Sequence, residues 1–415
     1  MAWDDVKVNG TTSEDAGDWN TLITTVKAAL AGANLNPAGY GWYIYPYGTS
    51  YAAVNKETSH IDFTSTCFGT VVNTCITSCP GNTPSIELGA YSYTISAQGI
   101  NMGQKSLNII GVTPCASLTN YGTRITCISN FPGFFITGGT IGASFEHPVI
   151  ANIHFDGNDS TYPAGAIHLI NVSHAMIQNV FIDDFFCNTA RAFWFYGEHG
   201  QSCYYNTFQN YCIRRTAYGL DFDGIVNANW IYGGHITNSR VPSGSTTWAG
   251  FYFHGCGSNH VVDVDIEDMT ATAEIGVWIT SGNGWHEFRG LRCEDNYRDI
   301  VMGADGDGAN HFFGGSTYST VSGYLPIVDN GAVKSIVIGR AGMENDKCGT
   351  ATMASSGSAV TVTHGLYTTP AYVFVSPSSS DMVNLWVTSI TATQFVIKSA
   401  LDAESSRTIY WRAVK

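Results

Sequence analysis

The 415-residue chain has little charge: only 13% of its residues are Asp, Glu, Lys or Arg. Its 19 lysines and arginines are outnumbered by 33 acidic residues, which gives a formal net charge of −14. Nucleic-acid binding depends on clustered positive charge that neutralises phosphates, so we expect no nucleic-acid partner. The acidic balance would also repel acidic polymers over most of the surface, although it does not exclude a local site for one.

Long apolar runs are also lacking. No stretch of about 18 apolar residues occurs, and the first 30 residues contain no charged-then-apolar leader. We therefore expect a mature chain without membrane insertion, either not secreted by the usual route or shown without its leader.

A standard zinc-binding pattern is absent as well. Of the 11 cysteines, Cys67, Cys75, Cys79, Cys115 and Cys127 lie in the first third, at spacings that match no common zinc site. We interpret them as buried thiols together with one or two disulfides near the N-terminus, and we expect no metal and no cofactor.

Helical spacing is nearly absent from the middle of the chain, where a short strand pattern recurs instead. The repeats begin at residues 166 (AIHLIN), 192 (AFWFYG), 219 (GLDFDG), 250 (GFYFHG), 276 (GVWITS), 299 (DIVMGA) and 325 (LPIVDN). A second strand series lies between them, for example QNVFIDD from 178 and NHVVDVDIED from 259. Each unit of 23 to 31 residues thus contains at least two strands separated by Gly, Asn, Asp or Ser turns.

This repeat predicts a parallel β-helix. Solenoids built from leucine-rich or armadillo repeats need helices, and a propeller blade needs about 40 residues. In a β-helix, coils stack about 4.8 Å apart, so apolar side chains at equivalent positions form columns inside. The first predicted inner column is Ile167, Phe193, Leu220, Phe251, Val277 and Ile300. The second is Leu169, Phe195, Phe222, Phe253, Ile279 and Met302.

The two ends of the chain have different patterns. Residues 13–32 form an amphipathic helix pattern that would cap the first coil, and residues 41–51 and 86–96 are predicted to be the first strands. Residues 358–414 contain five alternating strands, which suggest a small antiparallel β-sandwich. We therefore expect a capping segment (1–40), a β-helix (41–342) and a C-terminal sandwich (349–415), with a boundary near 342–351.

The capping helix, the segment "IELGAYSYTIS…LNIIGV" (86–112) and the coils to about residue 340 resemble the pectate-lyase-like right-handed parallel β-helix superfamily, and within it phage tailspikes and capsular polysaccharide depolymerases. The tail "VTVTHGLYTTPAYVFVSP…TIYWRAV" resembles small modules of phage tail proteins that trimerise the spike or touch sugars. The resemblance implies a homotrimer on a virion tail or outside the cell, attached to a phage tail protein, with a bacterial surface polysaccharide as its target.

The outward columns of the predicted β-helix concentrate aromatic and acidic residues. If Leu220 and Phe222 point inward, Asp221 and Asp223 point outward, between aromatic residues of the coils before and after. Aromatic faces stack on sugar rings, while carboxylates and imidazoles bind hydroxyl groups. The predicted substrate-binding residues on this face are His168, Trp194, Tyr196, Tyr252, His254 and Trp278.

We expect Asp221 and Asp223 to act as the acid and base of a glycoside hydrolase. Residues two apart on a strand are separated by about 6.8 Å, near the carboxylate spacing of inverting glycosidases. Glu198, in the loop after the Trp194 strand, is the alternative acid. Arg214, which lies about one coil away from Asp183 and Asp184, is expected either to hold an acidic sugar or to belong to a structural ion-pair ladder.

Other chemistries remain open. The Asn-Thr-Asp, Asp-Asp, Gly-His-Gly and Arg-x-Lys blocks of polygalacturonases are matched only by "FIDDF" (181–185), so we do not carry that site over. A lyase acting on a uronic-acid polymer would need a base and cationic groups, and "GADGDGAN" (303–310) is a poor calcium loop. A non-catalytic spike that binds a glycan would use the same aromatic column.

Overall fold

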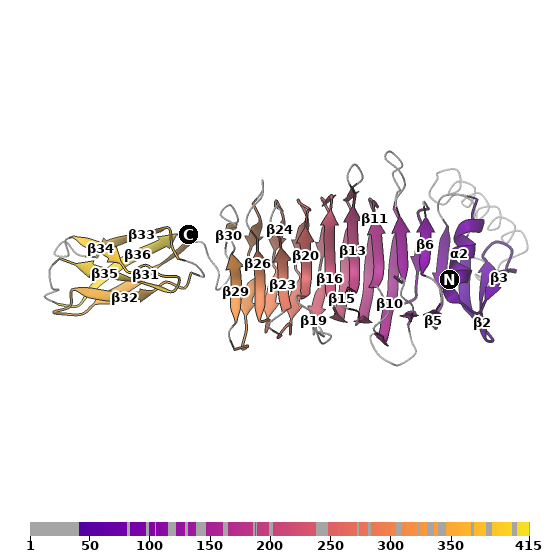
Figure 1. The fold of residues 1–415 in the computed structure, drawn as a ribbon, viewed down its shortest axis with the longest axis horizontal. Coiled ribbons are helices and arrows are strands. Elements are labelled where there is room, and N and C mark those ends of the chain that lie inside the picture. The colour runs from indigo at the N-terminus through magenta and orange to yellow at the C-terminus, as the bar shows by residue number, and fades with distance from the viewer. Residues whose placement is uncertain are drawn as a thin grey trace, which may run out of the picture.

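The computed structural model shows a rod of stacked β-coils followed by a small β-sandwich (Figure 1). The parallel β-helix predicted from the repeat is confirmed, as a solenoid of about seven turns. The capping helix predicted at 13–32 lies outside the described residues. The structure describes residues 41–414 apart from 81–83, 97–98, 104, 115–121, 129–131, 138–146, 161–164, 186, 188, 199–201, 238–247, 272–273, 281–283, 304–308, 323, 330–335, 339–345, 367–368, 379–383 and 401–404.

One face of the solenoid is a parallel sheet in which each coil contributes one strand. In spatial order its strands are β6 (Ile100–Gly103), β9 (Phe134–Thr137), β11 (Gly165–Ile170), β13 (Arg191–Gly197), β16 (Tyr218–Gly224), β20 (Trp248–His254), β23 (Glu274–Ile279), β26 (Arg298–Met302) and β29 (Leu325–Asp329). We call this sheet the single-strand face. Every residue of the two predicted inner columns is buried and paired in the predicted register.

Aromatic stacking reinforces these inner columns. The Phe222 ring lies 4.8 Å from Phe195 in the preceding coil and 4.7 Å from Phe253 in the following one, with ring planes within 14° of parallel. Burial of one such ring contributes roughly 2 to 3 kcal/mol. The column therefore both fills the core and fixes the register between coils.

The rest of each coil forms a second sheet that bends at a corner. Early coils cross the corner with one long strand: β10 (Val149–Ser160), β12 (Met176–Phe185) and β15 (Thr207–Thr216). Later coils divide the same course into β18 (Trp230–Tyr232) and β19 (His235–Thr237), β21 (His260–Val262) and β22 (Asp265–Glu267), β24 (Glu287–Arg289) and β25 (Arg292–Glu294), and β27 (His311–Phe313) and β28 (Ser316–Tyr318). The strands β7 (Asn108–Ile110), β8 (Arg124–Cys127) and β30 (Ile336–Ile338) also belong to this sheet. At another corner, β14 (Cys203–Tyr204) pairs with β17 (Val226–Asn227).

The bend needs a left-handed backbone, and the sequence supplies residues that tolerate it. Asn152, Asn179, Asn210, Gly233 and Asp263 occupy this position in successive coils with φ between 52° and 61°. Asn, Asp and Gly adopt this conformation at the lowest cost. Asn179 Nδ2 also donates to Asn152 Oδ1 at 2.7 Å, which links the bends of two neighbouring coils.

A second polar series is buried inside the solenoid. Asn206 and Asn229 each receive a hydrogen bond from the backbone NH of a residue in the coil before: Ala175 N donates to Asn206 Oδ1 at 2.8 Å, and Asn206 N donates to Asn229 Oδ1 at 3.0 Å. Asn259 continues the series. In the next coil the position is taken by His286, whose Nδ1 accepts from Asn259 N at 3.4 Å. We call this series, which ends in Asn310, the asparagine ladder.

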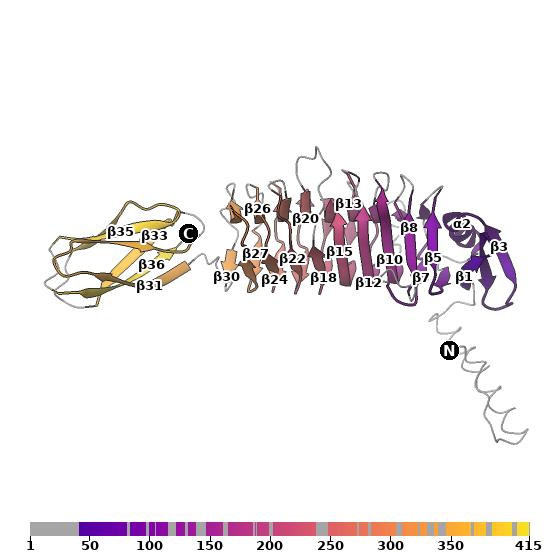
Figure 2. The same cartoon turned by 90° about the horizontal axis from the view of Figure 1, so that it is seen from below.

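The N-terminal end of the described rod carries a hairpin and a helix (Figure 2). The strands β1 (Gly41–Tyr47), β2 (Ser50–Asn55) and β3 (Ile61–Ser65) pair antiparallel, and β4 (Ser85–Leu88) and β5 (Ser92–Ile95) join the parallel sheet. The helix α2 (Phe68–Ser78), which packs against β2, β3, β5 and β6, was not predicted. Its β-branched "TVVNTCIT" disfavours a helix, and only burial of its apolar face overrides that preference.

No two of the described cysteines form a disulfide with each other, most of these thiols are buried, and Cys115 lies outside the described residues. Burial raises the pKa of Cys75 in α2 to about 12, so this thiol is unreactive near neutral pH. The expected disulfides are therefore not formed among the described cysteines. Within the described part of the chain, no helix has the length and apolarity needed to cross a membrane.

The C-terminal module is a sandwich of two small antiparallel sheets with a core separate from that of the solenoid. One sheet orders β31 (Asp346–Met353), β36 (Arg407–Val414) and β33 (Tyr372–Pro377), and the other β32 (Ala359–Thr363), β35 (Gln394–Ser399) and β34 (Leu385–Thr388). The five predicted strands are present. The additional strand β31 begins inside the segment that we interpreted as a boundary.

Candidate functional site

The candidate site lies on the outer surface of the single-strand face, where β13, β16, β20 and β23 run side by side. Because the inner columns fix the register, the outward residues also align between coils. Asp221 pairs with Trp194 before it and Tyr252 after it, and Asp223 pairs with Tyr196 and His254. The predicted grouping of these outward side chains is thus present.

Asp221 is completely buried by its neighbours, although it points away from the solenoid interior. Its Oδ2 accepts a hydrogen bond from Arg191 Nε, and its Oδ1 lies 2.8 Å from His254 Nε2. The Arg191 guanidinium also lies 4.6 Å from the centre of the Trp194 ring, a cation–π contact. A buried carboxylate is tolerated only with such partners, so Asp221 is held by one coil on each side.

Asp223 is the carboxyl group of the pair that reaches the surface. About a quarter of its side chain is exposed (25%), and its Oδ1 lies 3.2 Å from His254 Nδ1. Partial burial raises the pKa of Asp223 above its ordinary value. The charge of Asp221 adds to the rise, while His254 and Arg191 oppose it. Asp223 is therefore shifted toward the protonated form that a general acid needs.

A strip of aromatic rings adjoins these carboxylates. The Tyr252 ring stacks on His254 at 4.4 Å and on Trp278 at 4.5 Å, with ring planes 24° and 26° apart. On the preceding coils Trp194 and Tyr196 lie 5.2 Å apart. Because all of these rings are partly exposed, they present aromatic surface on both sides of β16 that is suited to the apolar faces of sugar rings.

Three residues at the site were not predicted from the sequence. Arg191 should point inward by strand alternation, yet its side chain reaches the outer surface and pairs with Asp221. Tyr218 stacks on Tyr252 at 5.6 Å, and the buried Trp248 lies parallel to Tyr218 at 6.3 Å. The available signal was a conspicuous arginine at the start of the strand that precedes Asp221, in a chain with few cations.

Two predicted residues lie at the margin of the site. His168 is nearly buried and presents its ring edge-on to Trp194 at 5.1 Å, so it supports the strip rather than extending its surface. Glu198 is exposed in the turn after β13, where its backbone NH donates to Asn171 Oδ1 at 3.0 Å. Its predicted catalytic role stays a prediction.

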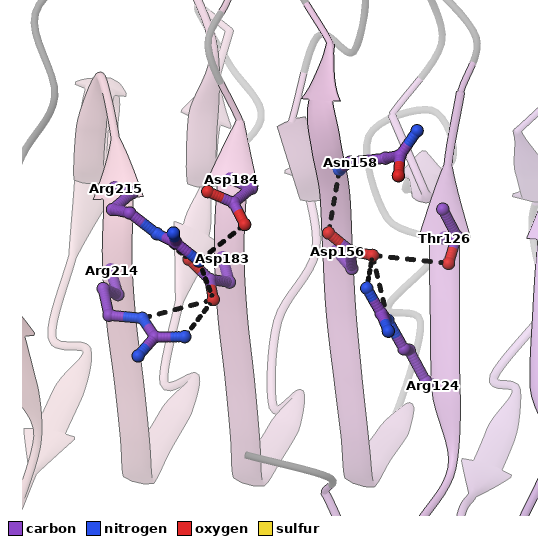
Figure 3. Close-up of polar contacts among 8 residues, drawn as sticks. All are labelled: Arg124, Thr126, Asp156, Asn158, Asp183, Asp184, Arg214 and Arg215. Carbon is purple, nitrogen blue, oxygen red and sulfur yellow. Dashed lines mark hydrogen bonds and ion pairs between the residues drawn. The ribbon is translucent and has the colours of Figure 1, made fainter. Parts of the chain in front are cut away.

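Arg214 does not belong to this site, because it lies on β15 of the bent sheet. Figure 3 shows its guanidinium directed at Asp183, with Nε 3.2 Å from Oδ2. Arg215 joins Asp183 and Asp184, and Arg124 makes a similar pair with Asp156 one coil earlier. Of the two interpretations offered for Arg214, the structure shows the ion-pair ladder.

The described residues contain no cluster of three or more His, Cys, Asp or Glu side chains placed to hold a metal ion. Most of the weak calcium-like segment 303–310 lies outside the described residues. What the candidate site offers chemically is therefore one partly exposed carboxyl group, an imidazole, a paired arginine and an aromatic surface.

Comparison with known proteins gives likeness to solved structures only. No family model matches the sequence, and no curated protein matches it. The fold is similar to the ORF18 structure of Geobacillus virus E2 (TM-score 0.47, 10% identity, 91% of this chain and 88% of that chain). It is also similar to the tailspike gp49 of Acinetobacter baumannii bacteriophage Fri1, a capsular polysaccharide depolymerase (0.36, 8%, 83% and 81%). A third is the tailspike of E. coli bacteriophage HK620 in complex with pentasaccharide (0.33, 9%, 80% and 74%). The last two structures are phage tailspikes, the class of protein that the sequence resembles. No residue role is transferred from them.

Proposed function

We propose that this chain binds and degrades a bacterial surface polysaccharide by hydrolysis of its glycosidic bonds, in the manner of a phage tailspike. The observation that carries the proposal is the position of Asp223: a carboxyl group with a raised pKa, partly exposed beside a strip of stacked rings. The rings bind the apolar faces of the sugars, and the carboxyl group faces the bond between two of them.

In this proposal Asp223 is the general acid that protonates the leaving oxygen. A proton donor works best when its pKa lies near the working pH, and partial burial moves Asp223 in that direction. Trp194, Tyr196, Tyr252 and Trp278 form the binding subsites.

Asp221 receives a different role from the one expected from the sequence. A carboxylate without exposed surface, with one oxygen on Arg191 and the other on His254, does not reach a substrate. We therefore propose Asp221 as a positioning residue: it fixes the His254 ring, and the other nitrogen of that ring fixes Asp223.

Glu198 is the second carboxylate that the proposal requires. Asp223 pairs with Tyr196, and Glu198 lies two residues beyond Tyr196, in the turn that follows β13. A step of two residues spans at most about 7 Å and neighbouring strands are about 4.8 Å apart, so the two Cα atoms lie within about 12 Å of each other. Inverting glycosidases hold their two carboxyl groups about 6.5 to 9.5 Å apart, with a water molecule between. Glu198 would activate that water as the base.

Binding without cleavage is the second candidate, and the state of Asp221 favours it. Both carboxylate oxygens of Asp221 are engaged in hydrogen bonds, so the expected pair of aspartates supplies only one carboxyl group to a substrate. A glycan-binding spike would need only the ring strip and the hydrogen-bonding groups beside it. This candidate predicts retention of the polymer without shortening it.

We also propose a homotrimer, located on a virion tail or outside the cell and attached to a phage tail protein. The support is the resemblance of the sequence to tailspikes, together with the exposed surface of the C-terminal module. Tyr372 and Phe374 on β33 and Tyr410 on β36 are 64%, 60% and 54% exposed. Large exposed rings on neighbouring strands are typical of a surface that contacts another chain or a sugar.

The test is incubation of the protein with a panel of purified capsular polysaccharides and lipopolysaccharides. Hydrolysis releases reducing ends, whereas lyase action produces an unsaturated uronate that absorbs at about 232 nm. Binding alone gives retention of the polymer with neither signal. Cleavage with new reducing ends supports the proposal, and retention alone would favour the second candidate.

Variants then test the residue assignments. Asp223→Asn and Glu198→Gln should each lower the cleavage rate by about 100-fold or more, since general acid–base groups contribute that much. The matched control is Asp265→Asn, which removes a carboxylate from the bent sheet, where it pairs with Arg292 at 3.0 Å. Retention of more than about a tenth of the rate in Asp223→Asn would rule out its role as the acid.

A further inference from the structure

A second surface with stacked rings lies on the bent sheet, on a different face from Asp223. It consists of Trp230 and Tyr232 on β18 and His260 on β21, which we call the indole platform. The Trp230 ring lies 4.1 Å from His260 with planes 11° apart, and 5.7 Å from Tyr232 with planes 9° apart. Trp230 is 39% exposed, a large fraction for a tryptophan.

One side of the platform is open because the preceding coil carries a small residue. Thr207 pairs with Trp230, and Gln209 pairs with Tyr232. The short Thr207 side chain cannot cover an indole ring, whereas His260 covers the opposite side. Gln209 Nε2 donates to Gln178 Oε1 at 2.8 Å, so side-chain amide groups lie beside the uncovered side of the platform. A flat ring face next to hydrogen-bonding amides matches the two kinds of surface on a sugar.

The surroundings of the platform favour a saccharide over a second protein chain. His260 Nδ1 lies 3.8 Å from Glu287 Oε2, and Glu287 also pairs with Arg289. Charged residues are depleted from the centres of protein–protein interfaces but are usual beside sugar-binding rings. The occupant that fits this mixture of rings, amides and a balanced ion pair is a neutral or weakly charged glycan.

The platform is also close to the candidate site along the chain. Asp223 and Trp230 belong to the same coil and are seven residues apart in the sequence. Even a fully extended chain of that length spans at most about 25 Å. A long polymer held at Asp223 can therefore continue around the corner to Trp230, whereas an oligosaccharide short enough to lie on one face contacts only one of the two surfaces.

We propose that the indole platform is a second binding site for the polysaccharide, which holds a segment of the polymer distant from the cleaved bond. This inference rests on the proposed function, because its occupant is the same polymer. Its effect is one of avidity: the second contact strengthens the binding of long chains and leaves that of short ones unchanged.

The test uses the full chain with Asp223→Asn, which should bind without cutting. The probes are the intact capsular polysaccharide that the wild-type protein retains or cleaves in the panel, and a short oligosaccharide prepared from it by partial acid hydrolysis. Trp230→Thr is the informative variant, since the paired Thr207 shows that the sheet accepts threonine there. Trp230→Phe keeps a ring, and Trp386→Thr removes a similarly exposed indole (43%) from the C-terminal module.

Trp230→Thr should weaken binding of the intact polymer about fivefold, equivalent to about 1 kcal/mol, and change oligosaccharide binding by less than about twofold. Trp230→Phe and Trp386→Thr should retain most of the polymer affinity. Equal polymer affinity in Trp230→Thr and its parent overturns the inference while leaving the proposed function intact. A smaller assembly mass for Trp230→Thr in light scattering also overturns it, because the face would then join copies of the chain. If the wild-type protein neither retains nor cleaves any polysaccharide of the panel, both proposals fail.

Discussion

Replacement of His286 by asparagine tests whether one residue of the asparagine ladder makes the solenoid sensitive to acid. His286 occupies an asparagine position and is completely buried, with Phe253 4.4 Å from its ring. Its Nδ1 accepts a hydrogen bond from Asn259 N. Burial, with a smaller contribution from nearby His260, lowers the pKa of His286 to about 3, and a hydrogen bond with the Cys256 backbone opposes this shift. A proton on Nδ1 would remove the acceptor for Asn259.

The sign and size of the effect follow from this pKa. In the unfolded chain histidine titrates at about 6.5, so between pH 6.5 and pH 3 the unfolded state binds a proton that the folded state does not. The free energy of unfolding therefore falls as the pH falls, by about 1.4 kcal/mol for each pH unit below 6.5. At about pH 5 the loss is roughly 2 kcal/mol.

The assay is guanidinium unfolding of the wild-type protein and His286→Asn, followed by tryptophan fluorescence at about pH 7.5 and about pH 5. Asparagine does not titrate and can continue the ladder, so the variant should lose about 2 kcal/mol less than the wild-type protein between the two conditions. All other titrating groups are common to both proteins and cancel in the comparison. Equal losses in the two proteins would refute the assigned pKa of His286.

Three further substitutions address the site, the ion-pair ladder and the core. Asp221→Asn removes a charge that raises the pKa of Asp223, so the alkaline limb of the pH–rate profile for cleavage should move to lower pH. Asp183→Asn removes the carboxylate that holds two partly exposed arginines, and should lower the free energy of unfolding by about 2 kcal/mol in urea titrations. Phe222→Ala interrupts the stacked inner column and should cost about 3 to 5 kcal/mol, measured by thermal unfolding.

Each of these predictions has an outcome that would contradict it, and the ion-pair prediction also has a control variant. Asp265→Asn breaks an ion pair whose two side chains are 49% and 41% exposed, and should cost less than about 1 kcal/mol. A similar cost for Asp183→Asn would mean that its ladder contributes no more than a surface pair. An unchanged pH profile in Asp221→Asn would contradict the coupling to Asp223. A loss below about 1 kcal/mol in Phe222→Ala would contradict close packing of the column.

The sequence predicted the parts of the fold in which a short pattern repeats along a strand and from coil to coil. Alternation within "GLDFDG" decides which residues point inward, and recurrence of the same pattern in the next coil decides which residues stack. Leu220 and Phe222 could therefore be aligned with Phe251 and Phe253 from the sequence alone, and so could the outward Asp221 with Tyr252. Because the coils stack in parallel without offset, residues at the same position of the repeat are also neighbours in space, so the repeat in the sequence predicts the contacts between coils.

The features that were not predicted depend on contacts that do not recur from coil to coil. Arg191 lies at the start of β13, where the alternation breaks, and only the finished packing shows its side chain turning outward to Asp221. The burial of Asp221 likewise depends on the height of neighbouring side chains above the sheet, which alternation does not give. The helix α2 occurs only once in the described chain, so no repeat supported its prediction, and its β-branched residues pointed to a strand.

Asp221 and Asp223 can both point outward from β16 because Asp221 has a partner in the coil on each side. Asp221 lies between a cation from the coil before, Arg191, and an imidazole from the coil after, His254. Asp223 shares that imidazole and keeps a quarter of its side-chain surface exposed. The equivalent outward positions of the neighbouring coils hold Trp194 and Tyr252 rather than acids. A parallel solenoid repeats its backbone in every coil, so the chemistry of this face is confined to one coil by side chains alone. Moving the acid pair to the following coil would replace His254 and leave Arg191 two coils away.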